Sequence, residues 1–93
     1  MAILLTSSEI QSYLADLTDW VIEDNSIKTT LTFKNFIEAV NYINRVVAPA
    51  EAAGHHPDLF ISYNRVTVSL TTHDAGGLTH KDFSLAKTLS QLA

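Results

Sequence analysis

The stretch that organises this chain is residues 51–82, EAAGHHPDLFISYNRVTVSLTTHDAGGLTHKD. It contains all four histidines and all three glycines of the 93-residue sequence. Histidine has an unperturbed pKa of about 6.5, so it is the side chain that exchanges protons most readily near neutral pH. Because these groups are concentrated in one third of the chain, we expect the remaining residues to form a scaffold that holds them.

Length and composition predict one small domain over residues 1–93. The chain has no cysteine, which excludes disulfides and thiolate zinc sites. Its net charge of −4, without a stripe of Lys and Arg, argues against direct nucleic-acid binding. The apolar run at the start is too short for a signal peptide or a membrane span, so we expect a cytoplasmic protein with no membrane association.

The first third of the chain predicts one helix followed by a hairpin. Thr6 and Glu9 have capping-box spacing, and the apolar residues that follow predict a helix over residues 7–17. Residues 20–23 predict a short strand. Residues 27–33 alternate between apolar and polar side chains, which is typical of a half-buried strand paired with the first.

A second helix begins after Asn35, which can cap it. Pro49 lies late in this helical pattern and removes one backbone donor, so the helix either stops there or continues through Ala53. Gly54 is suited to end it, because glycine adopts a left-handed conformation without steric cost. The apolar spacing predicts a core-facing side made of Phe36, Val40, Ile43 and Val47.

The last part predicts two strands and a third helix. Residues 59–63 and 66–72 are strand candidates, and alternation over the second of them places His73 at the end of its polar row. Thr79 and Asp82 have the spacing that starts a final helix. The order αββαββα predicts an α+β fold, a four-stranded antiparallel sheet with helices packed on one face.

Within residues 51–82 the order is Glu51, His55-His56-Pro57, Tyr63, His73 and Asp82, with THDAGGLT around the third histidine. This spacing resembles the pterin-4a-carbinolamine dehydratase family, closely in the C-terminal half and by pattern only in the N-terminal half. The resemblance implies the same fold and a hydro-lyase that dehydrates 4a-hydroxytetrahydropterin to the quinonoid dihydropterin. It also implies that the enzyme recycles the pterin for aromatic amino-acid hydroxylases, without a metal or cofactor.

The chemistry of dehydration fits the three histidines that match the family spacing. The leaving oxygen needs a proton and a ring nitrogen must lose one, so the reaction is general acid–base catalysis near pH 7. We therefore expect His55, His56 and His73 to be catalytic, without a fixed division of roles. His80 has no counterpart in the motif and is expected to be solvent-exposed in the first turn of the last helix.

Other residues are expected to border or support the site. The resemblance implies that the segments around the histidines line a pterin pocket, with Glu51 as a bordering acid. Asp82 is expected first as a helix cap, where a carboxylate favours the free amides, and Trp20 first as a core residue, both in supporting roles. The candidates for substrate binding are Glu51, Gly54, Pro57, Thr71, Thr72 and Asp74.

Two other functions use the same features. The three histidines are also potential zinc ligands, although their positions lack the familiar helical spacing of such sites. Family members in animals also serve as a dimerisation partner of a homeodomain transcription factor, so a binding module acting as a transcriptional coactivator is the other alternative.

Self-association is expected on physical grounds and from the resemblance, which implies homodimers or homotetramers. A chain of this length has a thin core, and an open sheet leaves strand edges unpaired. The alternative is a monomer whose edges are blunted by twist and by Lys28. In the last helix, the sequence predicts more apolar surface than one small sheet can cover, from Leu85, Leu89 and Leu92.

Overall fold

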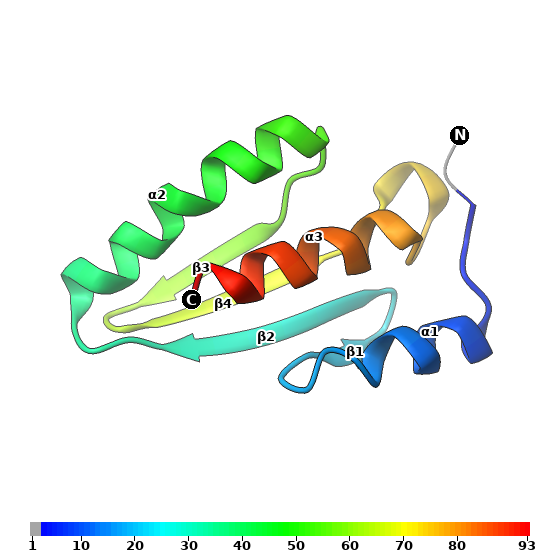
Figure 1. Ribbon diagram of the computed structural model, residues 1–93, viewed down its shortest axis with the longest axis horizontal. Coiled ribbons are helices and arrows are strands. Elements are labelled where there is room, and N and C mark those ends of the chain that lie inside the picture. The colour runs from blue at the N-terminus through cyan, green and yellow to red at the C-terminus, as the bar shows by residue number, and fades with distance from the viewer. Residues whose placement is uncertain (1–2) are drawn as a thin grey trace.

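The computed structural model describes residues 3–93 and has the predicted α+β architecture (Figure 1). The sheet is antiparallel throughout, with strand order β1-β2-β4-β3, so β1 and β3 form its edges. A 3₁₀ turn, η1, lies between β4 and the last helix. The elements are α1 (Ser7–Leu14), β1 (Val21–Glu23), β2 (Ser26–Thr32), α2 (Phe36–Ala53), β3 (Asp58–Ser62), β4 (Arg65–Leu70), η1 (His73–Ala75) and α3 (His80–Gln91).

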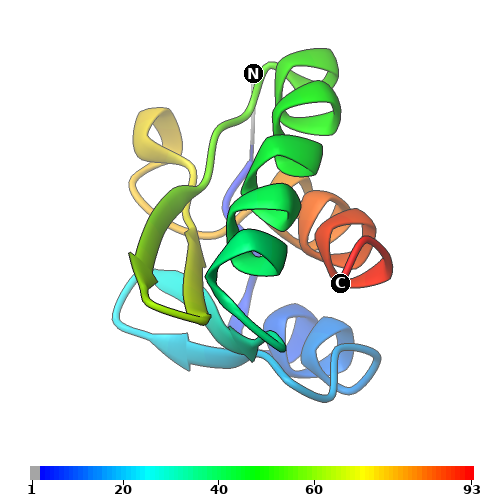
Figure 2. The same cartoon turned by 90° about the vertical axis from the view of Figure 1, so that its left-hand side faces the viewer.

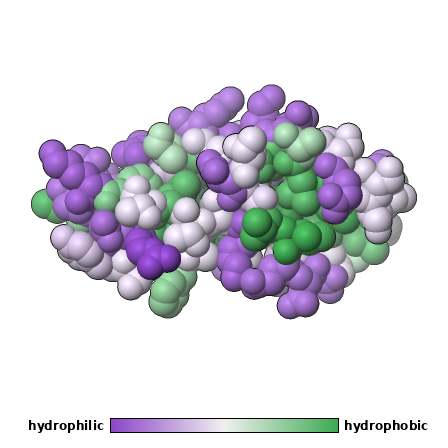
Figure 3. Space-filling view, turned by 90° about the horizontal axis from the view of Figure 1, so that it is seen from below, coloured by the Kyte–Doolittle hydropathy of each residue, from purple (hydrophilic) through white to green (hydrophobic). Residues whose placement is uncertain are grey.

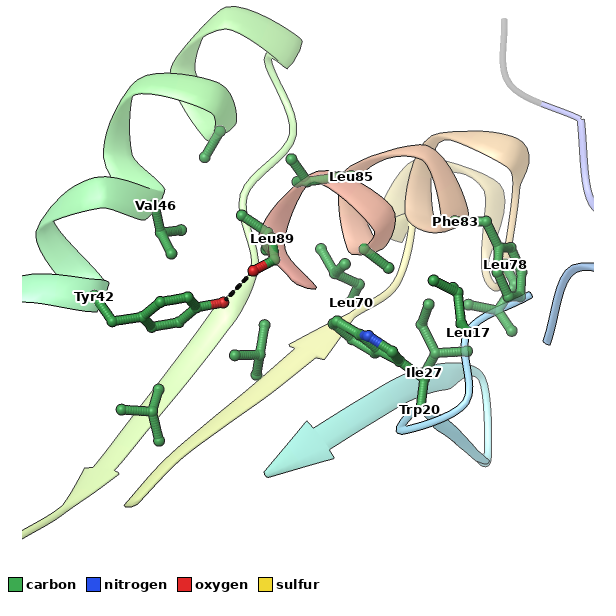
Figure 4. Packing of buried hydrophobic residues seen from close by; sticks show 14 of the residues in the cluster. Leu17, Trp20, Ile27, Tyr42, Val46, Leu70, Leu78, Phe83, Leu85 and Leu89 are labelled. Atoms are coloured by element: carbon green, nitrogen blue, oxygen red, sulfur yellow. Dashed lines mark hydrogen bonds between the residues drawn. The ribbon is translucent and has the colours of Figure 1, made fainter. Parts of the chain in front are cut away.

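The three helices lie on the same side of the sheet, as the view from the end shows (Figure 2). Between the helices and the sheet is one core of buried apolar side chains (Figure 4). Val66, Val68 and Leu70 supply it from the central strand β4, as their alternation predicted. No helix within residues 3–93 is long and apolar enough to cross a membrane.

The helix starts agree with the capping residues in the sequence. Thr6 and Glu9 form a complete capping box at α1, and Thr79 and Asp82 form another at α3. Asn35 accepts a hydrogen bond from the backbone of the residue three positions later at the start of α2. Each cap satisfies amides that have no partner inside the helix.

Two predicted elements are too long. α1 ends at Leu14 instead of residue 17, because the chain turns there, with the amide of Leu17 donating to the carbonyl of Leu14. β4 ends at Leu70, and Thr72 instead forms an isolated bridge with Gly77 that closes the following loop. His73 therefore lies in η1, and the prediction that it ends the polar row of a strand is wrong.

The predicted core face of α2 is also wrong. Phe36 and Val47 are 50% and 55% exposed, and Val40 and Ile43 are only partly buried. The helix is rotated so that the neighbouring stripe faces the sheet and α3. That stripe consists of Ala39, Tyr42, Val46 and Ala50.

Tyr42 explains this rotation. Its ring is completely buried and packs at a tilt against the ring of Phe33, and its hydroxyl donates to the carbonyl of Leu89 in α3 at 2.9 Å (Figure 4). Burial of an aromatic ring with a satisfied hydroxyl is strongly favourable. Burial raises the pKa of Tyr42 to about 12, an effect that the nearby charge of Arg45 partly opposes.

The last helix is better covered than predicted. Leu85 and Leu89 are buried and Leu92 is partly buried, so the prediction that this helix has more apolar surface than the sheet can cover is wrong. The exposed apolar side chains lie elsewhere, chiefly on the outer side of α2 and on the edge strands. They include Val21, Ile22, Phe36, Ile37, Val47 and Phe60.

Candidate active site

The first wall of the site is the end of α2. The helix continues past Pro49 to Ala53, which is one of the two predicted alternatives. Gly54 then takes a left-handed conformation with φ of 60° and caps it. The amide of His55 bonds back to the carbonyl of Ala50 at 3.1 Å, so the histidine pair leaves the helix in a fixed direction.

The second wall is the segment between β4 and α3. The amide of Thr72 donates to the carbonyl of Gly77 at 3.0 Å, and the carbonyl of Thr72 accepts from Ala75 and Gly76. These bonds fold residues 72–77 into a tight loop that presents His73 at the surface. Figure 1 shows this loop at the same end of the molecule as the last turn of α2 and the start of α3.

Asp82 joins these walls from behind. Its carboxylate is completely buried, and it accepts three hydrogen bonds within the described chain. Thr79 donates its backbone amide at 2.9 Å, Thr72 donates its hydroxyl at 2.8 Å, and His55 Nε2 lies at 2.6 Å. These hydrogen bonds offset the loss of solvation that burial of a polar group costs.

The proton positions in this network follow from counting donors. A hydroxyl has one proton, and Thr72 gives its proton to Asp82, so Thr79 must donate in its 2.9 Å contact with Thr72. An ionised carboxylate only accepts, so the Nε2 of His55 carries a proton. In the neutral ring, Nδ1 is then the atom that can take a proton.

His56 forms a similar pair in a different environment. Its Nε2 lies 2.5 Å from Glu51 Oε2, one turn back on α2. The two side chains are 61% and 69% exposed, whereas those of His55 and Asp82 are 11% and 0% exposed. The pair orients the ring of His56 but leaves it open to solvent.

A cleft of about 210 Å³ opens where these segments meet. It brings together all three predicted catalytic histidines and four of the six residues expected to bind substrate. Thr71 is fixed by a 2.6 Å hydrogen bond from its hydroxyl to the carbonyl of Asn25, in the β1–β2 turn. The lining residues are Gly54, His55, His56, Thr71, Thr72, His73, Asp74 and Lys81.

The other predicted residues lie around this cleft. Glu51 and Pro57 line an adjoining, mainly apolar hollow of about 180 Å³, which shares His56 with the cleft. Trp20 does not line the cleft: it is buried in the core, and its indole nitrogen donates to Ser90 Oγ at 2.7 Å. It supports the far end of α3. His80 is exposed in the first turn of that helix, as predicted.

Sequence reasoning missed the site roles of Lys81 and Thr79. Lys81 lines the cleft, and the buried hydroxyl of Thr79 completes the bonding of Thr72. The first turn of the last helix was the available signal, because a helix that begins next to the His73 loop places its first residues near the same cleft. Within residues 3–93, no group of three or more His, Cys, Asp or Glu side chains is arranged to hold a metal ion.

Comparisons of the sequence and of the structure with known proteins point to the same family. The family model described as pterin 4 alpha carbinolamine dehydratase matches residues 3–92. A protein of Picosynechococcus sp. is 60% identical over 99% of this chain and 100% of its own length, and one of Trichormus variabilis is 58% identical over 99% of both. Both are named as pterin-4-alpha-carbinolamine dehydratases.

A solved structure shares the fold at lower sequence identity. The crystal structure of a transcriptional coactivator/pterin dehydratase from Brucella melitensis superposes with a TM-score of 0.92 at 35% identity. The match covers 96% of this chain and 97% of that one. The two chains therefore share the same fold over nearly their whole length.

Proposed function

The chain belongs to the pterin-4a-carbinolamine dehydratase family and is a hydro-lyase, and on that premise we propose that it dehydrates 4a-hydroxytetrahydropterin by histidine acid–base catalysis. The observation that supports this most directly is the cleft in which His55, His56 and His73 meet. The product is quinonoid dihydropterin, in a reaction that recycles the pterin for aromatic amino-acid hydroxylases.

The reaction requires two balanced proton movements. The bond from carbon 4a to the hydroxyl oxygen breaks, and the oxygen leaves with the electron pair and accepts a proton to become water. The electrons of the N5–H bond form the new double bond between N5 and carbon 4a, and this proton passes to a base. The residues of the cleft must therefore supply one acid and one base.

We assign the base to His55. Its Nε2–H is held by the buried Asp82, so Nδ1 is available to take the proton from the ring nitrogen. The imidazolium that forms is stabilised by the carboxylate behind it, as in other histidine–carboxylate pairs. His56 and His73 are more exposed, and they supply the proton to the leaving hydroxyl and hold the substrate.

Single alanine replacements test this assignment. His55→Ala, His56→Ala and His73→Ala should each lower the rate of dehydration, by about 10²–10⁴-fold for the principal acid or base. His80→Ala is the matched control, because His80 is exposed outside the catalytic cleft, and it is assayed with a pterin that has no anionic substituent at C6. Activity should survive extensive dialysis against EDTA. If the three single variants stayed active and His80→Ala were inactive, the site would be misplaced. If activity were lost on EDTA treatment and recovered when zinc is added, the metal alternative would be favoured.

The recycling role has a separate test. Adding the protein to an aromatic amino-acid hydroxylase assay with limiting tetrahydropterin and a dihydropterin reductase should increase the number of turnovers per pterin. The His55→Ala variant should not increase it. Equal turnover with and without the active protein would restrict the proposal to the isolated dehydration.

A binding function is the second candidate, because the Brucella relative is described as a transcriptional coactivator as well as a dehydratase. The outer side of α2 is a suitable surface, since Phe36, Ile37 and Val47 are 50%, 68% and 55% exposed. Exposed apolar groups gathered on one helix favour a protein partner. Ile37→Glu should abolish capture of a partner while keeping dehydration; a partner retained by this variant would contradict the assignment.

We also propose that the chain forms homodimers or homotetramers. Figure 3 shows a hydrophobic area on the side of the molecule that carries α1 and the edge strand β1, where Val21 and Ile22 are 59% and 44% exposed. An apolar edge strand favours pairing with a second copy. Sedimentation at micromolar concentration should give a mass above the 10.2 kDa of one chain; a single species at that mass would refute association.

A further inference from the structure

A second hollow, of about 380 Å³, adjoins the catalytic cleft. It lies between the last turns of α2 and the residues of α3 from His80 to Thr88, and it shares His55 and Lys81 with the cleft. These two side chains therefore have the reaction site on one side and the hollow on the other. The lining residues are Pro49, Ala52, Ala53, His55, His80, Lys81, Ser84, Leu85 and Thr88.

The charge of this hollow is opposite to that of the chain. The sequence has ten acidic and six basic residues, yet no carboxylate lines the hollow, and its ionisable side chains are two histidines and Lys81. In contrast, Asp74 lines the catalytic cleft, Glu51 lines the hollow beside β3, and Asp16 lines one beside α1. Lys81 therefore gives this hollow a positive charge that no lining carboxylate offsets, which favours a negatively charged group there.

The shape of the hollow suits a substituent rather than a separate small ion. Its walls on α2 are the short apolar side chains of Pro49, Ala52 and Ala53, and Leu85 contributes from α3. Such walls can pack against the carbon atoms of a ligand's substituent. Lys81, at the border shared with the cleft, can pair with a negative charge on that substituent. A pterin bound at His55 would place a ring substituent at this border.

We propose that the hollow receives the C6 substituent of the pterin, and that the enzyme prefers substrates in which this substituent carries an anionic group, such as a phosphate ester or a carboxylate. This inference rests on the proposed function and deepens it. Lys81 is then a specificity-determining residue, which acts through the charge of the substituent and takes no part in the proton transfers at N5 and carbon 4a.

Two substrates that differ only in the anion test the proposal. The 4a-hydroxy forms of 6-hydroxymethyl-tetrahydropterin and of its phosphate ester are compared by the ratio of their kcat/KM values. The wild-type protein should favour the ester by about fivefold to tenfold at low salt, and added salt should reduce the ratio. Equal kcat/KM values would overturn the inference while leaving the proposed function intact.

Matched variants locate the effect. Lys81→Gln should lower the ratio about fivefold, whereas Lys87→Gln, which removes the same charge from the same helix outside this hollow, should leave it unchanged. Ala52→Trp, which fills the hollow from α2, should also lower the ratio. If Lys81→Gln and Lys87→Gln gave the same ratio, the assignment to this hollow would be wrong.

A binding measurement separates this inference from the proposed function. If neither substrate were turned over, fluorescence titration with oxidised 6-hydroxymethylpterin and its phosphate ester would decide: tighter binding of the ester that Lys81→Gln removes supports the hollow, and equal binding overturns it. Inorganic phosphate at the same concentration should not compete with the ester, because it lacks the ring. Competition by inorganic phosphate would overturn the assignment to a substituent.

Discussion

His55 and His56 are neighbours in the chain, and each directs its Nε2 to a carboxylate at 2.6 Å or 2.5 Å. By distance the two pairs are equivalent. They differ in burial: His55 and Asp82 are 11% and 0% exposed, whereas His56 and Glu51 are 61% and 69% exposed. They also differ in sequence separation: Asp82 is 27 residues from His55, whereas Glu51 is five residues from His56.

This difference teaches that burial and connectivity, more than contact distance, set how much a histidine–carboxylate pair contributes to stability and to catalysis. An exposed pair is screened by water and contributes between about 0 and 1 kcal/mol. When one member of a buried pair is removed, the other stays buried without a partner, and the free energy of unfolding falls by about 3–5 kcal/mol. We therefore expect the two pairs to respond very differently to the same chemical change.

Asp82→Asn should give the largest effect. An asparagine can still accept from Thr79 and Thr72 through its oxygen, but its amide group then faces His55 with a donor. The ring must present an unprotonated Nε2, so its Nδ1 can no longer act as the base. We expect kcat to fall by about 10²–10⁴-fold, measured with folded protein verified by circular dichroism. Activity within threefold of wild type would remove His55 from the role of base.

Tyr42 provides a buried polar contact far from catalysis. Its folded-state pKa of about 12 exceeds the ordinary value of 10, so its contribution to stability is present below pH 10 and is lost as the pH rises through 12. The free energy of unfolding should fall by about 3 kcal/mol over this range. Urea titrations should show this extra loss in the wild type relative to Tyr42→Phe, and parallel pH profiles of the two proteins would contradict it.

Thr72→Val tests the network behind His55. The change keeps the shape but removes the hydroxyl that donates to Asp82 and accepts from Thr79. We expect kcat/KM to fall about tenfold and stability to fall by about 1–2 kcal/mol. Thr72→Ser keeps the hydroxyl but loses the methyl group, so it changes the packing and should retain most of the rate. Similar rates for Thr72→Ser and Thr72→Val would assign the effect to packing alone.

Gly54→Ala tests the backbone that leads to both pairs. Nothing lies within 4 Å of an added Cβ, so the cost comes from the φ of 60° alone and should be about 1 kcal/mol in thermal or urea unfolding. Gly54→Asn should cost less, because asparagine tolerates this conformation better. An alanine variant as stable as the wild type would show that the cap relaxes without strain.

Glu51→Gln should give the smallest effect. The exposed pair orients His56 weakly, so we expect kcat/KM to fall by less than about fivefold, with a difference from wild type that shrinks at high salt. The Asp82→Asn defect should persist at high salt. If Glu51→Gln were as damaging as Asp82→Asn, the distinction between the buried and exposed pairs would fail.

The local signals of the sequence were sufficient to predict the type and order of the elements, but not the ends of α1 and β4. The capping residues at Thr6, Asn35 and Thr79 start the three helices, and Gly54 ends the second, because each acts on backbone groups within a few residues of itself. The alternation of apolar and polar residues in β4 correctly predicted which side of the strand is buried. The histidine spacing pointed to the residues that meet in the cleft.

The tertiary structure alone decided what each polar residue touches. α2 carries two adjacent stripes of apolar residues. Which stripe faces the core depends on the packing of Tyr42 against α3, and the sequence of α2 alone does not reveal that contact. The burial of Asp82 and the place of Lys81 at the border of two hollows depend on the approach of segments that are far apart in the sequence, such as His55 and Asp82, which are 27 residues apart. Caps and alternation are local and can be read from neighbouring residues, whereas burial and pairing are set by the whole packed chain.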